Sequence, residues 1–347
     1  MLKNLNITNF TVFHDIAIPF VPGVNIFIGK NGTGKTHLLK ILYSVLAGIQ
    51  ENRELKDKLG RVFLPRGLDI KRLIMKGEEE AGFSLRTRQN HELKGSIQAK
   101  GEYPIILSGF KAKQSKELLA KNGQGKPVYI PVKEMLANAP GFRSLYATRE
   151  VHFEEIYFDI IDRALLPELK HLQPPGVSES ADKLNSVVKE IQKIIGGKVS
   201  QKNEEFYLRS GKGEVEFSLL AEGHRKLALL WLLIKNGCLA PGGILFWDEP
   251  EANLNPGLMP IVVKSLLTLE QAGVQIFIAT HNYELLKEFD LQKNQHAILF
   301  NSLFFEEKKL QISQSSNYDG LDPNVIENQF SRLYDLEIKR SFGGEHE

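Results

Sequence analysis

An eight-residue run near the start of the chain has the composition of a loop that binds phosphate groups. It matches the pattern GxxxxGK[ST] in full; its residues are Gly29, Lys30, Asn31, Gly32, Thr33, Gly34, Lys35 and Thr36, and His37 follows. Glycines let successive backbone N–H groups turn inward around a phosphate, and the positive end of the next helix points at it. Lys35 would reach the β- and γ-phosphates of a nucleotide, and the Thr36 hydroxyl would bind Mg²⁺. We therefore predict that residues 29–37 bind ATP with Mg²⁺.

Two apolar runs in the second half of the chain end in residues that could complete such a site. The run ILFWDE carries Asp248 and Glu249 at its end, and the run VQIFIAT is followed by His281. Near-continuous apolar runs of this length are typical of buried parallel strands. We expect Asp248 to hold the magnesium ion, and Glu249 to orient and deprotonate the attacking water. The order strand, acid pair, helix, strand, histidine predicts that His281 lies beside the acid pair, so Lys35, Glu249 and His281 are the candidate catalytic residues.

The segments that must position these residues alternate between strands and helices. Strands are predicted at residues 5–10, 15–20, 24–29, 204–210, 214–220, 243–249, 274–280, 296–301 and 309–314. Helices are predicted from the phosphate loop to Gly48, at 223–236, from Pro256 to about 271, and at 322–341. This alternation indicates an α/β fold.

Residues 49–204 differ in character from the rest of the chain. They contain charged runs, short strand-like pieces at 83–88, 95–101, 103–109 and 128–136, and predicted helices at 151–169 and 181–195. Ser180 could cap the second helix, and Gly196-Gly197 could end it. We therefore expect a discontinuous head made of 1–48 and 205–347, and an inserted α+β lobe at 49–204.

The overall composition excludes several classes of protein. The 347 residues are 42% hydrophobic and 25% charged, and the formal net charge of +2 is too small to indicate nucleic-acid binding by itself. The single cysteine, Cys238, cannot form a disulfide framework within the chain. No apolar run is long enough to span a membrane, and the first residues lack the apolar core of a signal peptide. We expect a cytoplasmic protein with no membrane association.

These motifs together resemble the ABC-type ATPase heads of the SMC, RecF and OLD class. The phosphate loop lies at the very N-terminus, the acid pair, the segment EANLNP and the histidine lie near the C-terminus, and a long insertion separates them. The resemblance covers about residues 1–48 and 205–310, and it extends to the compact, stand-alone AAA-family ATPases of bacterial defence or toxin–antitoxin loci. It implies an ABC-type P-loop NTPase head with a mixed β-sheet core.

The resemblance also implies that two heads meet face to face and enclose two ATP molecules. The family's signature LSGGQ falls on Leu220, Ala221, Glu222, Gly223 and His224, which would cover the partner's ATP. Ala221 replaces the serine that bonds the γ-phosphate, a loss of about 1.5–3 kcal/mol per site. Glu222 replaces a glycine with a negative charge that is unfavourable beside a phosphate. We expect a dimer that closes on ATP and hydrolyses it slowly, although a surface helix without a role in the partner's site is the simpler alternative.

Two further loops of the family can be sought in this sequence, and only one of them falls on a clear position. Asn253 falls in the D-loop, which in the family crosses the dimer axis and couples the two sites. The glutamine loop is hard to assign, because Gln50 follows the first helix too soon; Lys133 or Glu134 is the alternative.

Two charged segments allow alternative interpretations. The basic segment 84–133 could grip nucleic acid or form a solvated docking face, with ten cations against Glu92, Glu102 and Glu117; the cations are Arg86, Arg88, Lys94, Lys100, Lys111, Lys113, Lys116, Lys121, Lys126 and Lys133. The acidic segment 151–162 could be a nuclease site or a packed helix; its polar residues are His152, Glu154, Glu155, Asp159 and Asp162. The apolar residues between them favour packing.

The leading hypothesis from the sequence is an ATPase that dimerises around Mg-ATP and couples closure to a partner effector or to nucleic-acid sensing, as in antiphage defence. The partners it implies are a second copy of the chain, in a homodimer or higher oligomer, and a toxin, effector or nuclease protein. The main alternative is an ATP-held structural scaffold that sequesters a toxin or effector, with hydrolysis incidental. A transporter subunit is the third hypothesis, and the long insertion argues against it.

Overall fold

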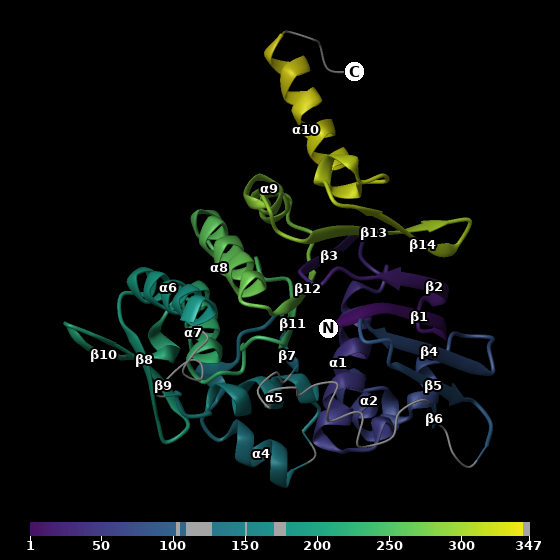
Figure 1. Ribbon diagram of the computed structural model, residues 1–347, viewed down its shortest axis with the longest axis horizontal. Coiled ribbons are helices and arrows are strands. Elements are labelled where there is room, and N and C mark those ends of the chain that lie inside the picture. Colours follow the sequence, from purple (N-terminus) through teal and green to yellow (C-terminus); the bar gives the residue numbers. More distant parts are fainter. Residues whose placement is uncertain (102–104, 109–126, 150, 170–177, 343–347) are drawn as a thin grey trace.

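A six-stranded mixed sheet forms the centre of the computed structural model (Figure 1). The structure describes all residues except 102–104, 109–126, 150, 170–177 and 343–347. The strand order is β14-β13-β3-β12-β11-β7; the bounds are β3 Val24–Gly29, β7 Pro127–Ile130, β11 Ile244–Asp248, β12 Gln275–Ala279, β13 Ile298–Glu306 and β14 Lys309–Ser315. All neighbours are parallel except β13 and β14. The carboxyl ends of β3, β12 and β11 therefore meet at one edge of the sheet.

Both faces of this sheet are covered, which explains why its central strands are apolar without alternation. On one face, Val24, Ile26 and Ile28 of β3 join a core that includes α7 (Glu222–Lys235) and α8 (Met259–Gln271). On the other face, Phe27 joins a core with α1 (Lys35–Glu51). Alternate residues of one strand thus build two separate cores.

A second, antiparallel sheet has the strand order β2-β1-β4-β5-β6. Its strands are β1 Leu2–Phe10, β2 Phe13–Pro19, β4 Glu80–Thr87, β5 Glu92–Gln98 and β6 Ile105–Ser108. The buried side chain of Gln275 at the start of β12 joins the two sheets, because it accepts from Leu2 N (2.7 Å) and donates to Leu2 O (3.0 Å).

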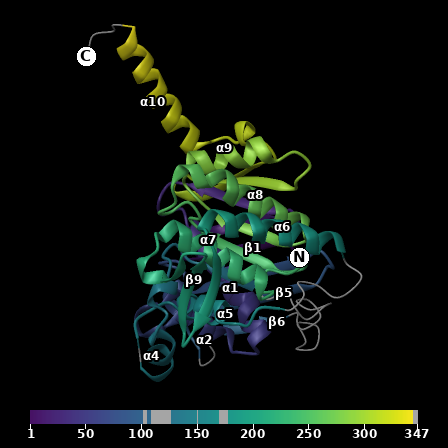
Figure 2. The ribbon, with the colours of Figure 1, turned by 90° about the vertical axis from the view of Figure 1, so that its left-hand side faces the viewer.

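The remaining elements lie around the two sheets. A small antiparallel sheet, β10-β9-β8, lies beside α6 (Ser178–Ile195), which packs on α7 and α8. Its strands are β8 Lys198–Lys202, β9 Glu205–Ser210 and β10 Gly213–Glu216. The other helices are α2 Leu55–Phe63, α4 Phe142–Thr148, α5 Glu155–Ala164, α9 Tyr283–Gln292 and α10 Val325–Ser341. Helix α10 stands away from the body in both views (Figures 1 and 2). No helix among the described residues combines the length and the apolar composition needed to cross a bilayer.

The structure confirms the α/β class with a mixed sheet and corrects several predicted boundaries. Helix α1 does not stop at Gly48 but continues to Glu51, because Asn52 takes the left-handed conformation that ends it (φ 54°). Helix α6 begins at Ser178, so Ser180 lies inside the helix and is not its cap. The strand predicted at 214–220 ends at Glu216, because the next three residues form a 3-10 turn that buries Phe217.

Residues 49–204 contribute strands to both large sheets. β4, β5 and β6 extend the sheet begun by β1 and β2, and β7 is the edge strand next to β11. The sheets therefore cross the predicted boundaries near 48 and 205. The division into a head and an inserted lobe stays a prediction.

The acidic segment 151–162 is explained by ion pairs within the fold. Lys58 of α2 is fully buried, and its Nζ lies 3.1 Å from Glu155 and 2.8 Å from Asp159 of α5. Tyr43 of α1 donates to Asp159 (2.6 Å), and Lys40 of α1 pairs with Glu154. No cluster of three or more potential metal ligands occurs in the described part of the chain. These carboxylates therefore join α1, α2 and α5, which favours packing over a nuclease site.

We predict that Lys58→Met destabilises the protein strongly. Burial by itself lowers the pKa of Lys58, but Asp159, Glu155 and Glu51 outweigh it and hold the pKa above its usual value. Removing the cation takes away the buried positive charge that Glu155 and Asp159 share, which costs about 3–5 kcal/mol. Urea unfolding monitored by circular dichroism measures this loss. The exposed neighbour gives a matched control, Lys56→Met, which we expect to change stability by less than about 0.5 kcal/mol. Equal stability of the two variants would contradict the ion-pair interpretation.

Candidate functional site

The phosphate loop connects β3 to α1 and needs glycine at two described positions. A Cβ atom on Gly29 (φ 151°) would lie 2.4 Å from the carbonyl oxygen of Leu303 on the neighbouring strand β13. A Cβ atom on Gly34 (φ 87°), the N-cap of α1, would lie 2.6 Å from Val12. The first turn of α1 carries no acidic residue, so the positive end of its dipole is available to an anion.

Lys35 is held against the loop that it belongs to. Its Nζ donates to the carbonyl oxygens of Gly29 (2.7 Å) and Lys30 (3.3 Å), and the Thr33 hydroxyl also donates to Lys30 O (2.9 Å). Burial lowers the pKa of Lys35, and the nearby carboxylates Glu249 and Asp248 oppose this shift. A phosphate bound in this loop would lose water and would pair with the buried ammonium group of Lys35.

Asp248 at the carboxyl end of β11 lies beside Thr36. The Thr36 side chain is near enough to the Asp248 carboxylate to lower its pKa, and Tyr129 of β7 donates to Asp248 Oδ2 at 3.3 Å. Burial raises the pKa of Asp248 to about 6, and Thr36 and Tyr129 oppose the shift. A hydroxyl and a carboxylate side by side are the two protein oxygens with which a phosphate-bound Mg²⁺ is held. The residues present thus fit the predicted magnesium site.

Glu249 and His281 meet at the ends of adjacent strands. β11 and β12 are in register, with Asp248 opposite Ala279, so the residues that follow them are neighbours. His281 Nδ1 lies 3.1 Å from Glu249 Oε1, as the order of the elements predicts. Glu249 has the left-handed backbone conformation (φ 47°), and its N–H donates to Ala279 O (2.8 Å). This conformation is uncommon for a residue other than glycine.

The predicted signature loop and D-loop contact each other within one chain. Ala221 is the exposed N-cap of α7, and Glu222, Gly223 and His224 form its first turn. Glu222 Oε1 accepts from Asn253 Nδ2 at 3.0 Å. A Cβ atom on Gly223 would lie 3.2 Å from Leu254, so the helix start packs closely on the D-loop.

Several residues of the site had no recognisable motif. Lys226 of α7 is buried and donates to Ala252 O, beside the D-loop. Arg225 pairs with the buried Glu134, which follows β7, and donates to Leu220 O (2.7 Å) ahead of the signature residues. Tyr129 reaches Asp248 only because β7 pairs with β11. Of the two alternatives considered for the glutamine loop, Glu134 is thus joined to α7, whereas Lys133 is exposed.

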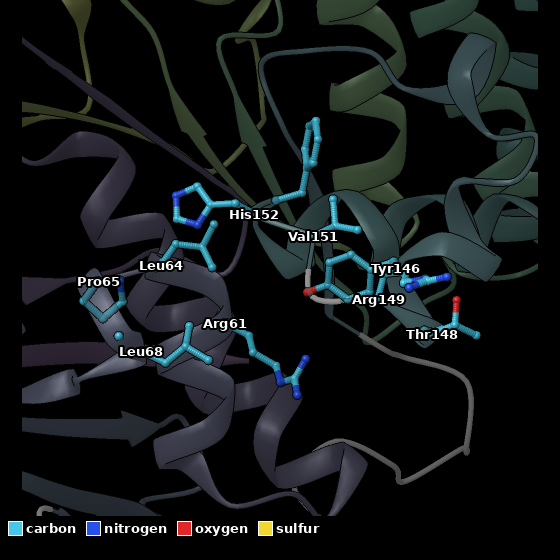
Figure 3. A pocket seen from close by; sticks show the side chains of 12 residues that line it. Arg61, Leu64, Pro65, Leu68, Tyr146, Thr148, Arg149, Val151 and His152 are labelled. Carbon is cyan, nitrogen blue, oxygen red and sulfur yellow. The ribbon is translucent and has the colours of Figure 1, made fainter.

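A hollow lies away from these residues, between α2 and the segment before α5 (Figure 3). It has a volume of about 600 Å³, and its lining includes Arg61, Arg149 and His152. Near this hollow, Phe63 at the end of α2 contacts the ring of His37 in the first turn of α1 (5.5 Å between centroids). Burial, and then Lys40, lower the pKa of His37. The nucleotide-binding role of His37 stays a prediction.

Several cations in the described part of the basic segment are paired within the fold. Arg86 lies 3.1 Å from Glu92, Lys100 pairs with Glu79, and Arg88 donates to Phe20 O (2.9 Å). The other half lies outside the described residues; it comprises Lys111, Lys113, Lys116, Lys121, Lys126, Glu102 and Glu117.

Comparison with known proteins agrees with this geometry. An SMC head bound to the C-winged helix domain of ScpA has a similar fold (TM-score 0.58, 15% identity, 92% of this chain and 98% of that chain). The SMC head domain from Thermotoga maritima is also similar (TM-score 0.51, 15% identity, 91% and 99%). The DNA replication and repair protein RecF of Streptococcus gordonii is 25% identical over 182 residues, 48% of this chain and 50% of its own length. The chain spans at most half the length of these curated relatives.

A family model matches residues 24–287, from β3 through the phosphate loop, the acid pair and His281 into α9. This match covers well over half of the chain. The fold is that of the ABC-type heads of SMC proteins. The chain therefore belongs to the family described as AAA domain, putative AbiEii toxin, Type IV TA system.

Proposed function

We propose that the protein is an ATPase that binds Mg-ATP between two copies of itself and hydrolyses it slowly. One observation carries this proposal: the phosphate loop, the Thr36–Asp248 pair and the Glu249–His281 pair lie at adjacent strand ends of one sheet. Family membership supports ATP as the nucleotide. These groups are far apart along the chain, and chance does not explain why they meet at one edge of the sheet.

Each residue of the site has a separate role in the proposed reaction. The backbone N–H groups of residues 29–36 and the Lys35 ammonium group bind the phosphates and stabilise the charge that develops on them. Thr36 and Asp248 would hold Mg²⁺, which when bound neutralises charge on the β- and γ-phosphates. Glu249 accepts a proton from the attacking water. His281, whose Nδ1 lies 3.1 Å from Glu249 Oε1, would orient that carboxylate and face the γ-phosphate.

The signature loop supports slow turnover. Ala221 offers no hydroxyl to a partner's γ-phosphate, and the Glu222 carboxylate lies at the positive end of α7, where the phosphate would bind. In the single chain Glu222 is held by Asn253. Closure of two heads on ATP must therefore overcome a like-charge repulsion that a glycine would not cause.

The partner in this proposal is a second protein whose activity closure controls. The family name refers to a putative toxin and a toxin–antitoxin system, and the similar SMC head is bound to a domain of ScpA. The SMC head's complex supports a protein partner, and the toxin–antitoxin description supports an effector of such a system in that role, as in a defence system, with nucleic acid as a second kind of trigger. The alternative is a scaffold that sequesters the effector in an ATP-held assembly, and the altered signature loop is the observation that favours it.

We predict that Lys35→Ala abolishes nucleotide binding. Its buried ammonium group is the cation that the loop presents to the phosphates, so its loss removes a charge-assisted contact of about 2–3 kcal/mol and more in a desolvated site. Titration with a fluorescent ATP analogue measures the effect. Lys339→Ala on the exposed helix α10 is the control, with affinity unchanged. Micromolar binding by Lys35→Ala would contradict the assignment of the loop.

We predict that Glu249→Gln traps an ATP-bound dimer. The amide cannot accept the water proton, so bound ATP persists and the two heads stay closed. Light scattering with Mg-ATP should show a doubled mass, and EDTA should restore the monomer. If neither this variant nor the wild-type protein increases in mass, the two-headed arrangement is wrong. A stable ATP-bound wild-type assembly with negligible phosphate release would instead favour the scaffold.

We predict that Ala221→Ser raises ATP turnover about tenfold. A restored hydroxyl adds one hydrogen bond to a charged phosphate, worth about 1.5 kcal/mol in the closed dimer. Glu222→Gly, which removes the carboxylate, should raise turnover further. Glu222→Gln is the matched control, because its amide oxygen can keep the bond from Asn253 while the charge is lost. Unchanged phosphate release in all three variants would mean that the loop does not contact the partner's ATP.

A further inference from the structure

Glu251 is a buried carboxylate that the reaction scheme above does not use. It lies two residues after Glu249 and is only 7% exposed. Its Oε1 accepts from the Thr280 hydroxyl (2.6 Å) and from the backbone N–H of His281 (3.3 Å). Its Oε2 is buried and has no hydrogen-bond partner among the described residues. Burying a carboxylate with one unpaired oxygen lowers the stability of the fold, so Glu251 needs an explanation other than stability.

The hydrogen bonds of Glu251 join two separate turns of the chain. One is the turn after β11, in which Glu249 has positive φ and Leu254 N donates to Glu251 O (2.9 Å). The other is the turn after β12, in which Asn282 N donates to the Thr280 hydroxyl (3.0 Å). Thr280 is fully buried, and its own N–H donates to Phe27 O (3.0 Å) at the end of β3. The Glu251 carboxylate therefore connects the turns after the two catalytic strands to a rigid part of the sheet.

His281 depends on this connection more than its neighbours do. Its side chain is half-exposed, so packing alone does not fix the ring. The fixed points are its backbone N–H, bonded to Glu251, and its Nδ1, 3.1 Å from Glu249 and 4.0 Å from Glu251 Oε1. A second clamp acts on the loop from α7, where Lys226 donates to Ala252 O. The distance between Glu249 and His281 therefore depends on the hydrogen bonds that Glu251 and Lys226 make to the two turns.

We propose that Glu251 is a positioning residue that, through Thr280 and the His281 backbone, holds His281 against Glu249 in the hydrolytic arrangement. The proposal rests on the ATPase function proposed above. Glu251 does not contact the phosphates, so its role is confined to the geometry of the pair. Displacement of a catalytic group by about 1 Å can cost about a hundredfold in rate, whereas nucleotide binding by the phosphate loop need not change.

The test compares Glu251→Ala with Glu251→Gln in the full-length protein. Glu251→Ala removes both hydrogen bonds, and we expect kcat to fall by about ten- to a hundredfold with KM for ATP changed less than about twofold. Glu251→Gln keeps an amide oxygen that can accept both bonds, and it should restore kcat to within about threefold of wild type. An equal loss of kcat in both variants, or a loss confined to KM, would overturn the proposal.

A double-mutant cycle with His281→Ala separates positioning from general stability. If Glu251 acts through His281, Glu251→Ala should cause no further loss of kcat once the histidine is gone. Additive losses would overturn the proposal, because they would show that Glu251 acts elsewhere. Thr280→Val removes one of the two bonds to Glu251, together with the bond from Asn282 N, and leaves the turn after β11 unchanged. It should reproduce part of the effect if Glu251→Ala does not fold.

A readout that needs no turnover distinguishes this proposal from the ATPase function itself. The imidazole signals of His281 in a ¹H–¹⁵N spectrum are assigned by their absence in His281→Ala. They should shift in Glu251→Ala and stay close to wild type in Glu251→Gln. Absence of hydrolysis by the wild-type protein would overturn the ATPase proposal alone, and the imidazole signals would then decide: unmoved signals in Glu251→Ala overturn the role of Glu251.

Discussion

The parallel pairing of β3, β12 and β11 is the constraint on which the rest of the structure depends. Parallel strands in register bring their carboxyl ends to one edge, and each of these strands is followed by a polar residue of the site. The apolar cores on both faces hold the register, because a shift by one residue would exchange Phe27 with its neighbours between the two cores. Strand pairing thus brings the phosphate loop, the acid pair and His281 together, so the contacts among these residues need not be strong.

The sequence predicted the parts of the site that consist of short, contiguous patterns. The phosphate loop needs glycine at Gly29 and Gly34 for steric reasons that act within a few residues, so its pattern is legible in the chain. Apolar runs identified β11 and β12, and their order placed His281 beside Glu249. The comparisons confirm the predicted SMC/RecF-like family. The functional roles of the individual residues stay predictions.

The parts that could not be predicted depend on partners far apart in the sequence. Tyr129 reaches Asp248 across 119 positions, and Lys58 is paired with Asp159 across 101 positions. Nothing near Lys58 distinguishes it from the exposed lysines beside it, since burial arises only when α5 covers α2. The extension of α1 past Gly48 has the same origin, because Leu55 and Lys58 of α2 pack over that glycine. Local signals therefore found the chemistry, and tertiary packing decided the elements that support it.

The signature loop and Glu251 both act on the turn after β11. Glu222 holds Asn253 from one side, Lys226 holds Ala252, and Glu251 holds Thr280 and His281 from the other side. A phosphate from a partner that displaced the Glu222 carboxylate would release Asn253, and with it one of the constraints on the turn that carries Glu249. In the proposed dimer, the residue that we expect to weaken closure is thus also bonded to the loop that carries Glu249 and Glu251. Binding of the second head and the geometry of hydrolysis would then be linked through a few hydrogen bonds, and we expect this linkage to slow turnover as much as the missing serine hydroxyl does.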